Sequence, residues 1–425
     1  MKRLKVLCSL CLCALVAFSG CAQSTGQTDT SQAGSAGEAQ THESAADTAA
    51  LRMLTPPDGV YVTTGMGTQE GYYLLEAQQG GGGQNMKYID FATAKLIYLS
   101  NDPSALHTNE ADTSCMEQSA AFLFVLNEKL YCTATDFSGA TVIFEMSPTG
   151  NDRRQVLKLP GNLSMKKGLA TDGVNLYTTL DAVNEQMQLT SALYCLSPET
   201  GEVTLLQELG EADLLYGADG NCLYFKCTDV LDGQDGLKAE STLKAYSLQN
   251  KSLETIFSWP EGSNCGAIRN GCFYYFTYED GTLYALNLTT KETVTLAQDL
   301  PNTGSMDGIY FDDIRDNHFL YWLVRPSDEP EKRECETYGV DLESGACSQV
   351  TLHGGFETGE YLPIVWETDN EFLVQYSREP QKVMLTAPDG SQYESETSVV
   401  QYALIAKADF WQDKPNYRLV GRIDQ

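Results

Sequence analysis

Histidine and the common catalytic motifs are scarce in this sequence. Only four histidines occur among 425 residues, and three of them, His107, His318 and His353, lie after residue 50. Residues 51–425 contain no G-x-S-x-G, no H-E-x-x-H and no Walker-type phosphate loop. The sequence therefore identifies no catalytic residue, and we expect a non-enzymatic role ahead of an enzymatic one.

Basic residues are also few. The chain has 28 Lys and Arg against 58 Asp and Glu, a net charge of −30. Without residues 1–20, which resemble a signal sequence, 25 basic residues face the same 58 acidic ones, a net charge of −33. Such a surface repels phosphate backbones and anionic headgroups. We therefore expect no nucleic-acid partner and a well-solvated surface.

One apolar run stands out, at residues 6–18, and its 13 residues are too few for the ~20 that a spanning helix needs. The basic stretch Met1-Lys2-Arg3-Leu4-Lys5 precedes it, and the small residues Ser19 and Gly20 follow, just before Cys21. A basic start, a short apolar core and small residues at a cleavage point make an export signal.

These first 21 residues resemble the bacterial lipoprotein signal, although Phe18 stands where that family more often has Leu. The resemblance implies a signal peptide over residues 1–20, lipidation of Cys21, and a protein anchored on the extracytoplasmic face of the cell membrane. The alternative is an ordinary signal peptide cleaved nearby, with Cys21 incidental. Residues 21–50 lack Phe, Trp and Tyr and are rich in Ser, Thr, Gln, Gly and Ala, which predicts a disordered low-complexity tether.

A turn followed by an aliphatic or aromatic residue and then Tyr recurs through residues 51–425. The Tyr positions are 131, 177, 224, 274 and 321, and Val374 ends a sixth copy, with spacings of 46, 47, 50, 47 and 53. Periods of about 40 to 50 residues are typical of propeller blades. A second marker, strand–polar turn–strand, occurs at residues 88–100, 194–206, 246–257 and 338–352. Two hairpins per repeat predict four strands per blade.

The sequence thus predicts an all-β fold, a seven-bladed propeller of four-stranded antiparallel blades over residues 51–425. In residues 282–288 both faces carry apolar side chains, as expected of a strand that is covered on both sides. The alternative, a β-sandwich with insertions, does not explain the near-fixed period. The expected blades are residues 51–116, 117–158, 159–209, 210–260, 261–301, 302–360 and 361–425. One way to close the ring is for a strand from residues 51–64 to complete the final blade.

Nine of the thirteen cysteines remain after the signal and Cys21 are set aside. Export favours disulfides. The spacing of these cysteines matches no recognisable disulfide pattern, however, so their pairing stays open. Several, such as Cys132 and Cys195, fall inside strand patterns, where buried thiols acting as small apolar groups fit as well.

Residues 99–119, with residues 88–100 before them, resemble a family of uncharacterised β-propeller lipoproteins from anaerobic Gram-positive bacteria. That family often carries Cys, Asn, Pro, Cys, His and a later Cys in this loop, and the matching positions here are Asn101, Pro103, His107 and Cys115. Ser100 and Ala105 replace the first two Cys, so only two soft ligands remain, fewer than the three or four of a zinc site. We therefore expect a surface loop, no metal and no cofactor.

Two other kinds of residue cluster are candidate ligand sites, one for Ca²⁺ and one for a sugar. Asp312, Asp313 and Asp316, and likewise Asp232 and Asp235, could meet a Ca²⁺ ion, but neither set has the ligand order of a Ca²⁺ loop, so solvated turns are expected. The aromatic run at residues 273–276 could stack on a sugar, although packing between blades is the commoner role.

The leading hypothesis for function is a lipid-anchored extracytoplasmic propeller that acts as a binding or interaction module. Its expected partner is a cell-surface glycan or protein. We expect contact with the membrane through the lipid anchor alone, and a monomeric chain. This step is an analogy from fold to use. The alternatives are a glycan-active hydrolase or lyase at the cell surface, and a structural envelope protein. Acidic residues converging with an Arg at the channel mouth would favour the enzyme, and a flat aromatic face would favour binding.

Overall fold

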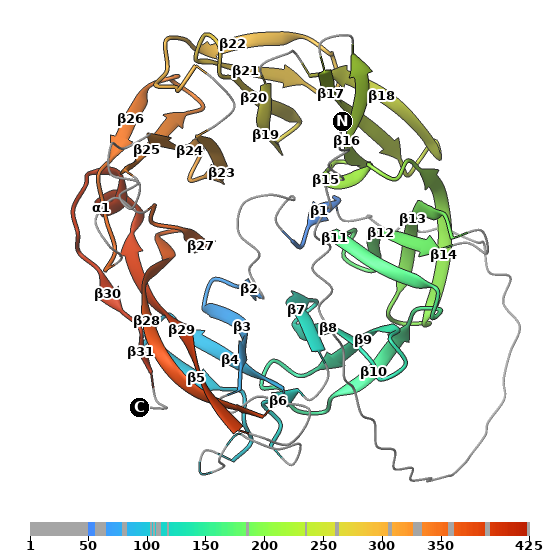
Figure 1. Cartoon of the computed structure of the whole chain (residues 1–425), viewed down its shortest axis with the longest axis vertical. Coiled ribbons are helices and arrows are strands. Elements are labelled where there is room, and N and C mark those ends of the chain that lie inside the picture. The colour runs from blue at the N-terminus through green and yellow to red at the C-terminus, as the bar shows by residue number, and fades with distance from the viewer. Residues whose placement is uncertain are drawn as a thin grey trace, which may run out of the picture.

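The computed structural model describes residues 50–55, 65–78, 83–102, 104, 107, 112–116, 119–183, 187–233, 236–259, 263–304, 308–325, 334–355, 361–386 and 392–422. These residues form seven sheets arranged around a central channel (Figure 1). Each sheet contains four antiparallel strands that follow one another in the chain. The predicted seven-bladed β-propeller is therefore confirmed, and each of the seven expected ranges contains the four strands of one blade.

Each blade is written here with its strands from the channel outward: blade 1 is β2–β5 (Met66–Gly67, Gly71–Ala77, Gln84–Asp90, Lys95–Tyr98), and blade 2 is β7–β10 (Ser119–Leu126, Lys129–Thr135, Thr141–Met146, Arg154–Lys158). Blade 3 is β11–β14 (Leu163–Thr171, Leu176–Val183, Leu189–Ser197, Glu202–Leu209), blade 4 is β15–β18 (Leu214–Asp219, Cys222–Gly233, Gly236–Ser247, Ser252–Ser258), and blade 5 is β19–β22 (Ser263–Arg269, Cys272–Thr277, Thr282–Asn287, Thr293–Ala297). Blade 6 is β23–β26 (Ile309–Arg315, His318–Arg325, Glu334–Asp341, Cys347–Val350), and blade 7 is β27–β30 (Ile364–Glu367, Glu371–Thr386, Gln392–Ala406, Arg418–Leu419). Three short strands lie outside this scheme: β1 (Arg52–Met53), β6 (Cys115–Met116) and β31 (Gly421–Arg422). A short helix, α1 (Lys407–Trp411), precedes β30.

Seven apolar clusters hold the ring together, one at each interface between adjacent blades. In the cluster between blades 4 and 5, for example, Leu243 packs with Phe273 and Leu286. A blade strand therefore buries side chains on both of its faces, which is why the sequence shows only loose alternation. Burial between neighbours, rather than in one central core, lets the fold exceed the usual size of a single-core domain.

The repeated turn joins the innermost strand of a blade to the second strand. In blades 5 and 6 the two central residues of this turn, Asn270-Gly271 and Asp316-Asn317, all have positive φ. Such turns match the twist of a two-residue hairpin. The marker tyrosines then lie in the second strands, for example Tyr274 in β20 and Tyr321 in β24.

The ring closes differently from the expected route. Strand β1 pairs antiparallel with β11 of blade 3, not with the final blade, and residues 56–64 lie outside the described part of the chain. The outer strand of blade 7 is β30, from the C-terminal end. The next residues, β31, then pair in parallel with β5, the outer strand of blade 1. The proposal that a strand from residues 51–64 completes the last blade is therefore wrong for the residues that can be tested, because the C-terminal segment already occupies that position.

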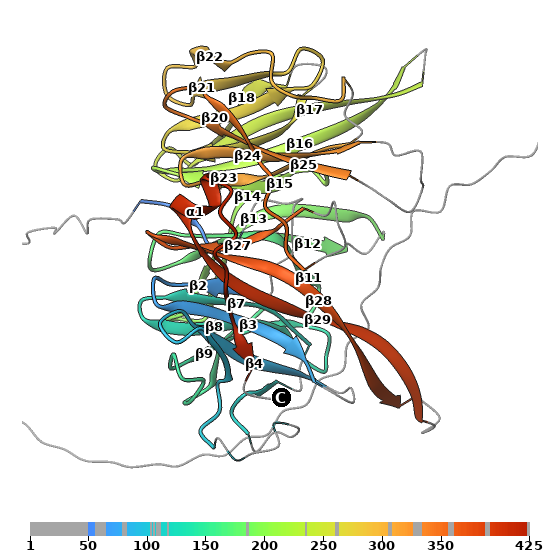
Figure 2. The ribbon, with the colours of Figure 1, turned by 90° about the vertical axis from the view of Figure 1, so that its left-hand side faces the viewer.

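The two faces of the ring differ. Short turns gather on one face, whereas the long hairpins β16–β17 and β28–β29 project from the other (Figure 2). The described chain enters at the short-turn face, where the Leu51 N–H donates to the Gly220 carbonyl at 3.0 Å. It then runs along the channel wall beside β11, and Leu51 and Leu54 are buried. Among the described residues, no helix is long and apolar enough to cross a membrane.

Candidate functional site

The residues that the sequence marks as metal candidates do not form a metal site. His107 Nδ1 lies 2.6 Å from a carboxylate oxygen of Asp112, and its ring stacks on Tyr98. The Cys115 thiol instead donates to Asn85 Oδ1 at 3.4 Å. Nowhere in the described part of the chain do three or more His, Cys, Asp or Glu side chains gather as metal ligands. The pair is therefore part of the packing of the blade 1 loop.

The acidic and aromatic candidates also separate. Asp316 lies on the short-turn face, where it accepts a hydrogen bond from Trp411 Nε1 at 2.9 Å and pairs with Lys407. Asp313 lines the channel pocket and Asp312 is buried behind its wall, so the three carboxylates do not converge. Phe273 and Tyr275 are buried between blades 4 and 5 and serve packing, as expected. Asp235 and Cys21, like the whole of the predicted signal and tether before residue 50, lie outside the described residues, as does the side chain of Asp232.

The described cysteines do not contribute to a functional site. Within the described residues Cys132, Cys195, Cys222, Cys272 and Cys347 are not in disulfides. Burial raises the pKa of the Cys132 thiol to about 12. A thiol in this state is protonated and unreactive at neutral pH, which agrees with a role as a small apolar group.

A pocket of about 230 Å³ lies in the central channel. Its walls come from the inner strands β1, β2, β15, β19, β23 and β27, so five blades and the N-terminal strand contribute to it. The charged residues that line it are Arg269, Asp313 and Arg315, and Trp366 closes one side. Its volume equals that of about eight liquid waters, enough for one small polar ligand or one residue of a polymer.

The inner strands carry bulges that bring polar side chains to this pocket. In β23 the register against β24 shifts between Phe311 and Asp313, which leaves Asp312 as the extra residue. Similar shifts occur in β15, β19 and β27. A bulge bends a strand and reverses its alternation. In β23 it lets Phe311 and Ile314 pack between blades while Asp313 and Arg315 line the channel.

Arg315 is the least satisfied polar group of the pocket. Its Nη2 atom lies 3.6 Å from Asp313 Oδ2 and 4.0 Å from Asp312 Oδ1, both longer than a hydrogen bond. Its buried Nε atom has no hydrogen-bond partner within the described residues. Burial opposes the charged form, but Asp313 and Asp312 outweigh it and raise the pKa of Arg315, so the guanidinium group stays protonated. The pocket therefore holds a permanent cation with unused donors.

Arg269 approaches the same region from the neighbouring blade. Its Nη1 atom donates to the Ile314 carbonyl at 2.9 Å, which fixes the side chain against β23. On the opposite side, Trp366 Nε1 donates to the Thr68 carbonyl at 2.9 Å, and its ring lies against Gly67. The Arg269 guanidinium group and the Trp366 indole are thus held by backbone contacts around the same cavity that Arg315 lines.

Asp312 lies behind the pocket wall and is nearly inaccessible, at 6% exposure. The Tyr361 hydroxyl donates a hydrogen bond to its carboxylate. Burial raises the pKa of Asp312 to about 6, although the charge of Arg315 and the hydrogen bond from Tyr361 act in the opposite direction. The Tyr361 ring in turn stacks on Trp322 at 4.1 Å, and Trp322 stacks on the half-exposed Tyr310. Perturbed carboxylates of this kind often mark functional sites.

Sequence reasoning missed both arginines, although the repeat contains a signal for them. Arg269 and Arg315 are each the last residue of an innermost strand, directly before the repeated turn. The corresponding residue before the turn is Leu126 in blade 2, Thr171 in blade 3, Asp219 in blade 4 and Thr368 in blade 7. Two adjacent repeats therefore place a cation where these other blades place an uncharged or acidic residue, and the ring brings the two positions together.

Comparison with protein-family models and with curated proteins finds no match. Among solved structures, the chain is similar to an oligogalacturonate lyase from Vibrio parahaemolyticus, with 13% identity, a TM-score of 0.47, and coverage of 84% of this chain and 91% of that one. An uncharacterised protein from Listeria monocytogenes has 12% identity and a TM-score of 0.48, with coverage of 76% and 92%. A GH74 xyloglucanase from Xanthomonas campestris has 12% identity and a TM-score of 0.42, with coverage of 86% and 61%. At these values the likeness concerns the propeller architecture alone.

Proposed function

We propose that the protein is a lipid-anchored extracytoplasmic binding module that recognises an acidic group of a cell-surface glycan or protein in its central channel. The observation that carries the proposal is the state of Arg315. Buried polar groups almost always find hydrogen-bond partners, yet within the described residues this guanidinium group lacks a partner at Nε and reaches carboxylates only beyond hydrogen-bond distance. A bound carboxylate would supply the missing acceptors, since the planar fork of Arg suits that group.

The other residues of the pocket suit the same ligand. Arg269 supplies a second cation, Asp313 can accept a hydrogen bond from a ligand hydroxyl, and Trp366 offers an apolar surface. A group that carries both a carboxylate and hydroxyls, as an acidic sugar does, would use all of these features. Arg269 and Arg315 lie inside the ring, and salt screens the acidic outer surface beyond about 8 Å, so the net negative charge does not prevent such binding.

Calorimetric titration of the purified full-length protein tests the proposal with matched pairs of sugars. Glucuronate and glucose form one pair, and N-acetylmuramate and N-acetylglucosamine form another, because the first of each pair carries a carboxylate that the second lacks. We expect the acidic sugar of at least one pair to bind at least tenfold more tightly than its neutral counterpart. Equal binding of acidic and neutral sugars in both pairs, or no binding at all, would contradict the proposal.

The second candidate, a glycan-active hydrolase or lyase, has two observations in its favour. The carboxylates of Asp312 and Asp313 approach Arg315 at the channel, an arrangement expected of an enzyme. The raised pKa of Asp312 gives a carboxyl group that could exchange a proton near neutral pH. Asp312 lies behind the wall rather than in the pocket, however, and Asp313 is the one carboxylate among the pocket-lining residues described. A hydrolase of the usual kind needs two carboxylates on either side of the bond, so binding is the better-supported function. Incubation of the protein with polygalacturonate or peptidoglycan tests this candidate. Release of reducing or unsaturated ends that is lost in Asp312→Asn would place the enzyme ahead of the binding module.

A further inference from the structure

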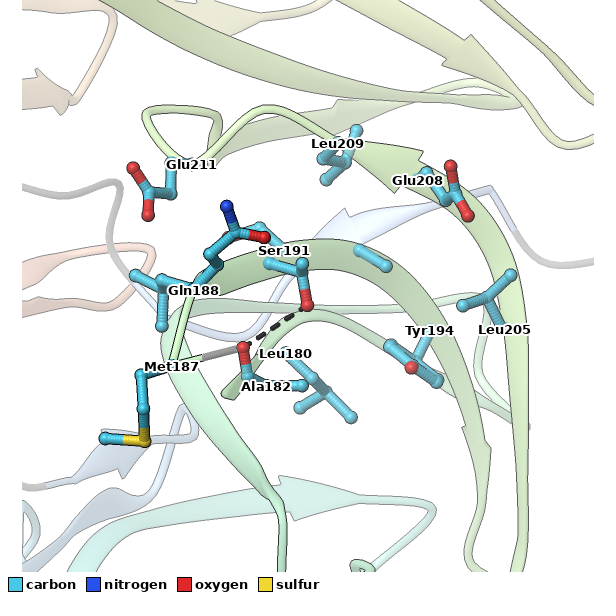
Figure 3. A pocket seen from close by; sticks show the side chains of 13 residues that line it. Leu180, Ala182, Met187, Gln188, Ser191, Tyr194, Leu205, Glu208, Leu209 and Glu211 are labelled. Atoms are coloured by element: carbon cyan, nitrogen blue, oxygen red, sulfur yellow. Dashed lines mark hydrogen bonds between the residues drawn. The ribbon is translucent and has the colours of Figure 1, made fainter. Parts of the chain in front are cut away.

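A groove on blade 3, lined by both apolar and polar side chains, is not covered by blade 2. The outer strands of blade 3, β13 and β14, have nine and eight residues, whereas β9 and β10 of blade 2 have six and five. Blade 3 therefore extends beyond its neighbour. A cavity of about 870 Å³ opens there, and every residue that lines it belongs to blade 3 or to the loop that follows it (Figure 3).

Strand register places apolar side chains on one face of the sheet at this groove. Leu180 pairs with Ala192, and Tyr194 pairs with Leu205, so these side chains share one face of the sheet. Leu205 is 52% exposed, and Met187 at the tip of the hairpin is 83% exposed. Figure 3 shows both side chains at the open cavity, on opposite sides of it. Grouped apolar side chains at a surface groove are typical of an interaction site.

Two carboxylates, Glu208 and Glu211, stand on the same side of the groove in Figure 3. Both are exposed, and neither side chain has an ion pair or hydrogen bond within the described residues. Lys166, a cation beside the groove, is already engaged: its Nζ donates to the Glu211 carbonyl at 2.7 Å and to Ser191 Oγ at 2.8 Å, and it pairs with Asp181. The rim of the groove therefore keeps two negative charges that a cationic partner would neutralise.

The groove also borders an open strand edge. Strand β14 ends its sheet, so its outer edge has no strand partner in the described part of the chain. Such an edge can accept an extended peptide through main-chain hydrogen bonds, with side chains adding specificity. The protein itself uses this arrangement in blade 1, where β31 pairs with the outer strand β5 and Arg422 binds Glu76.

From these four features we infer that the blade 3 groove binds an extended segment of a partner protein in which apolar residues alternate with Lys or Arg. The apolar residues cover Leu205 and the partly buried Tyr194, the backbone pairs with β14, and the basic residues meet Glu208 and Glu211. A second copy of this chain is a poorer occupant, since its net charge of −30 opposes association. The groove lies outside the channel, so this inference does not depend on the channel ligand.

Fluorescence anisotropy of labelled heptapeptides with the full-length protein tests the inference. The probe alternates leucine and lysine. One control peptide replaces its lysines with glutamate, and another replaces its leucines with serine. We expect the leucine–lysine peptide to bind at least tenfold more tightly than either control. In the protein, Leu205→Ser and the pair Glu208→Lys/Glu211→Lys should each weaken that binding at least tenfold.

A matched charge reversal separates a specific site from general attraction to an acidic protein. Glu254 and Glu292 are exposed residues of blades 4 and 5, and neither lines the groove. The pair Glu254→Lys/Glu292→Lys should leave peptide affinity within twofold. The inference is overturned if this pair weakens binding as much as the groove pair, if the serine–lysine peptide binds equally well, or if no peptide binds. Self-association that the groove variants abolish would also overturn it, because a second copy would then be the occupant.

Discussion

Arg422 donates two hydrogen bonds to the carboxylate of Glu76, at 3.0 and 2.7 Å, across 346 positions of the chain. Lys87 binds the same carboxylate, and the side chains of Arg422 and Lys87 are 7% and 3% exposed. Burial alone would raise the pKa of Glu76, but the hydrogen bond from Arg422 and the charge of Lys87 outweigh it and lower that pKa. This ion pair joins the last described strand to blade 1 and thereby closes the ring.

Loss of Arg422 should therefore destabilise the whole propeller. In Arg422→Met, Glu76 loses its bidentate partner but keeps Lys87, so the cost is that of lost hydrogen bonds to a charged group, about 1.5–3 kcal/mol. Arg325→Met is the matched control, because the Arg325–Glu336 pair is largely exposed and should contribute less than about 1 kcal/mol. Urea unfolding followed by circular dichroism measures both. Equal, small effects of the two substitutions would show that the ring does not depend on this closure.

Gly67 should tolerate no side chain, because its backbone lies against Trp366. A Cβ atom at Gly67 would lie 2.5 Å from the indole ring. Gly67→Ala should therefore displace Trp366, lower the free energy of unfolding by about 1–3 kcal/mol, and weaken any ligand bound in the channel. Gly161→Ala serves as the control, since a Cβ there would have no atom within 4 Å. Identical urea midpoints for the two variants would mean that Trp366 is not held as described.

Asp312 should make the protein less stable as the pH rises. Its pKa is raised to about 6 in the folded state from an ordinary value of 3.8. The folded state thus binds the proton more tightly, and stability falls as the pH rises between about 4 and 6. At 1.36 kcal/mol per pKa unit the loss is about 3 kcal/mol. The free energy of unfolding of Asp312→Asn minus that of the wild type should grow by roughly this amount from pH 4 to pH 7, and a constant difference would contradict the shift.

Cys21 should carry the lipid anchor. Replacement by Ala removes the only atom that could be lipidated at the predicted cleavage point, so Cys21→Ala protein should no longer be processed as a lipoprotein. Cell fractionation with detection of the processed form checks this. If Cys21→Ala protein is cleaved normally and stays in the membrane fraction, the anchor hypothesis fails. Cys132→Ala is a suitable control, because Cys132 is buried in blade 2 and is not part of the predicted signal.

The sequence predicted the fold because each blade is a local unit. The turn before Tyr274 and the turn before Tyr321 specify hairpins within a few residues, and their spacing reveals the repeat. The ring closure could not be found in this way. Strand β31 has two residues, and its pairing with β5 depends on contacts across almost the whole chain rather than on local pattern.

The channel site was hidden for a related reason. Arg269 and Arg315 are 46 positions apart in sequence, and their proximity follows from ring geometry and from the bulge at Asp312. The hydrogen bond from Tyr361 to Asp312 likewise joins blade 6 to the segment that leads into blade 7. Before the structure is known, acidic and aromatic residues in turns look alike whether they face solvent or the channel.

The effect of Arg315→Gln on carboxylate binding tests the central claim most directly. Gln keeps polar atoms in the channel but removes the charge and the guanidinium fork. With whichever acidic sugar binds the wild-type protein most tightly, we expect calorimetry to show at least tenfold weaker binding to Arg315→Gln. The neutral sugar of the same pair should be affected less than twofold, and Arg325→Gln, outside the channel, should bind like the wild type. Unchanged binding of the acidic sugar to Arg315→Gln would contradict the claim that the channel arginine recognises the ligand.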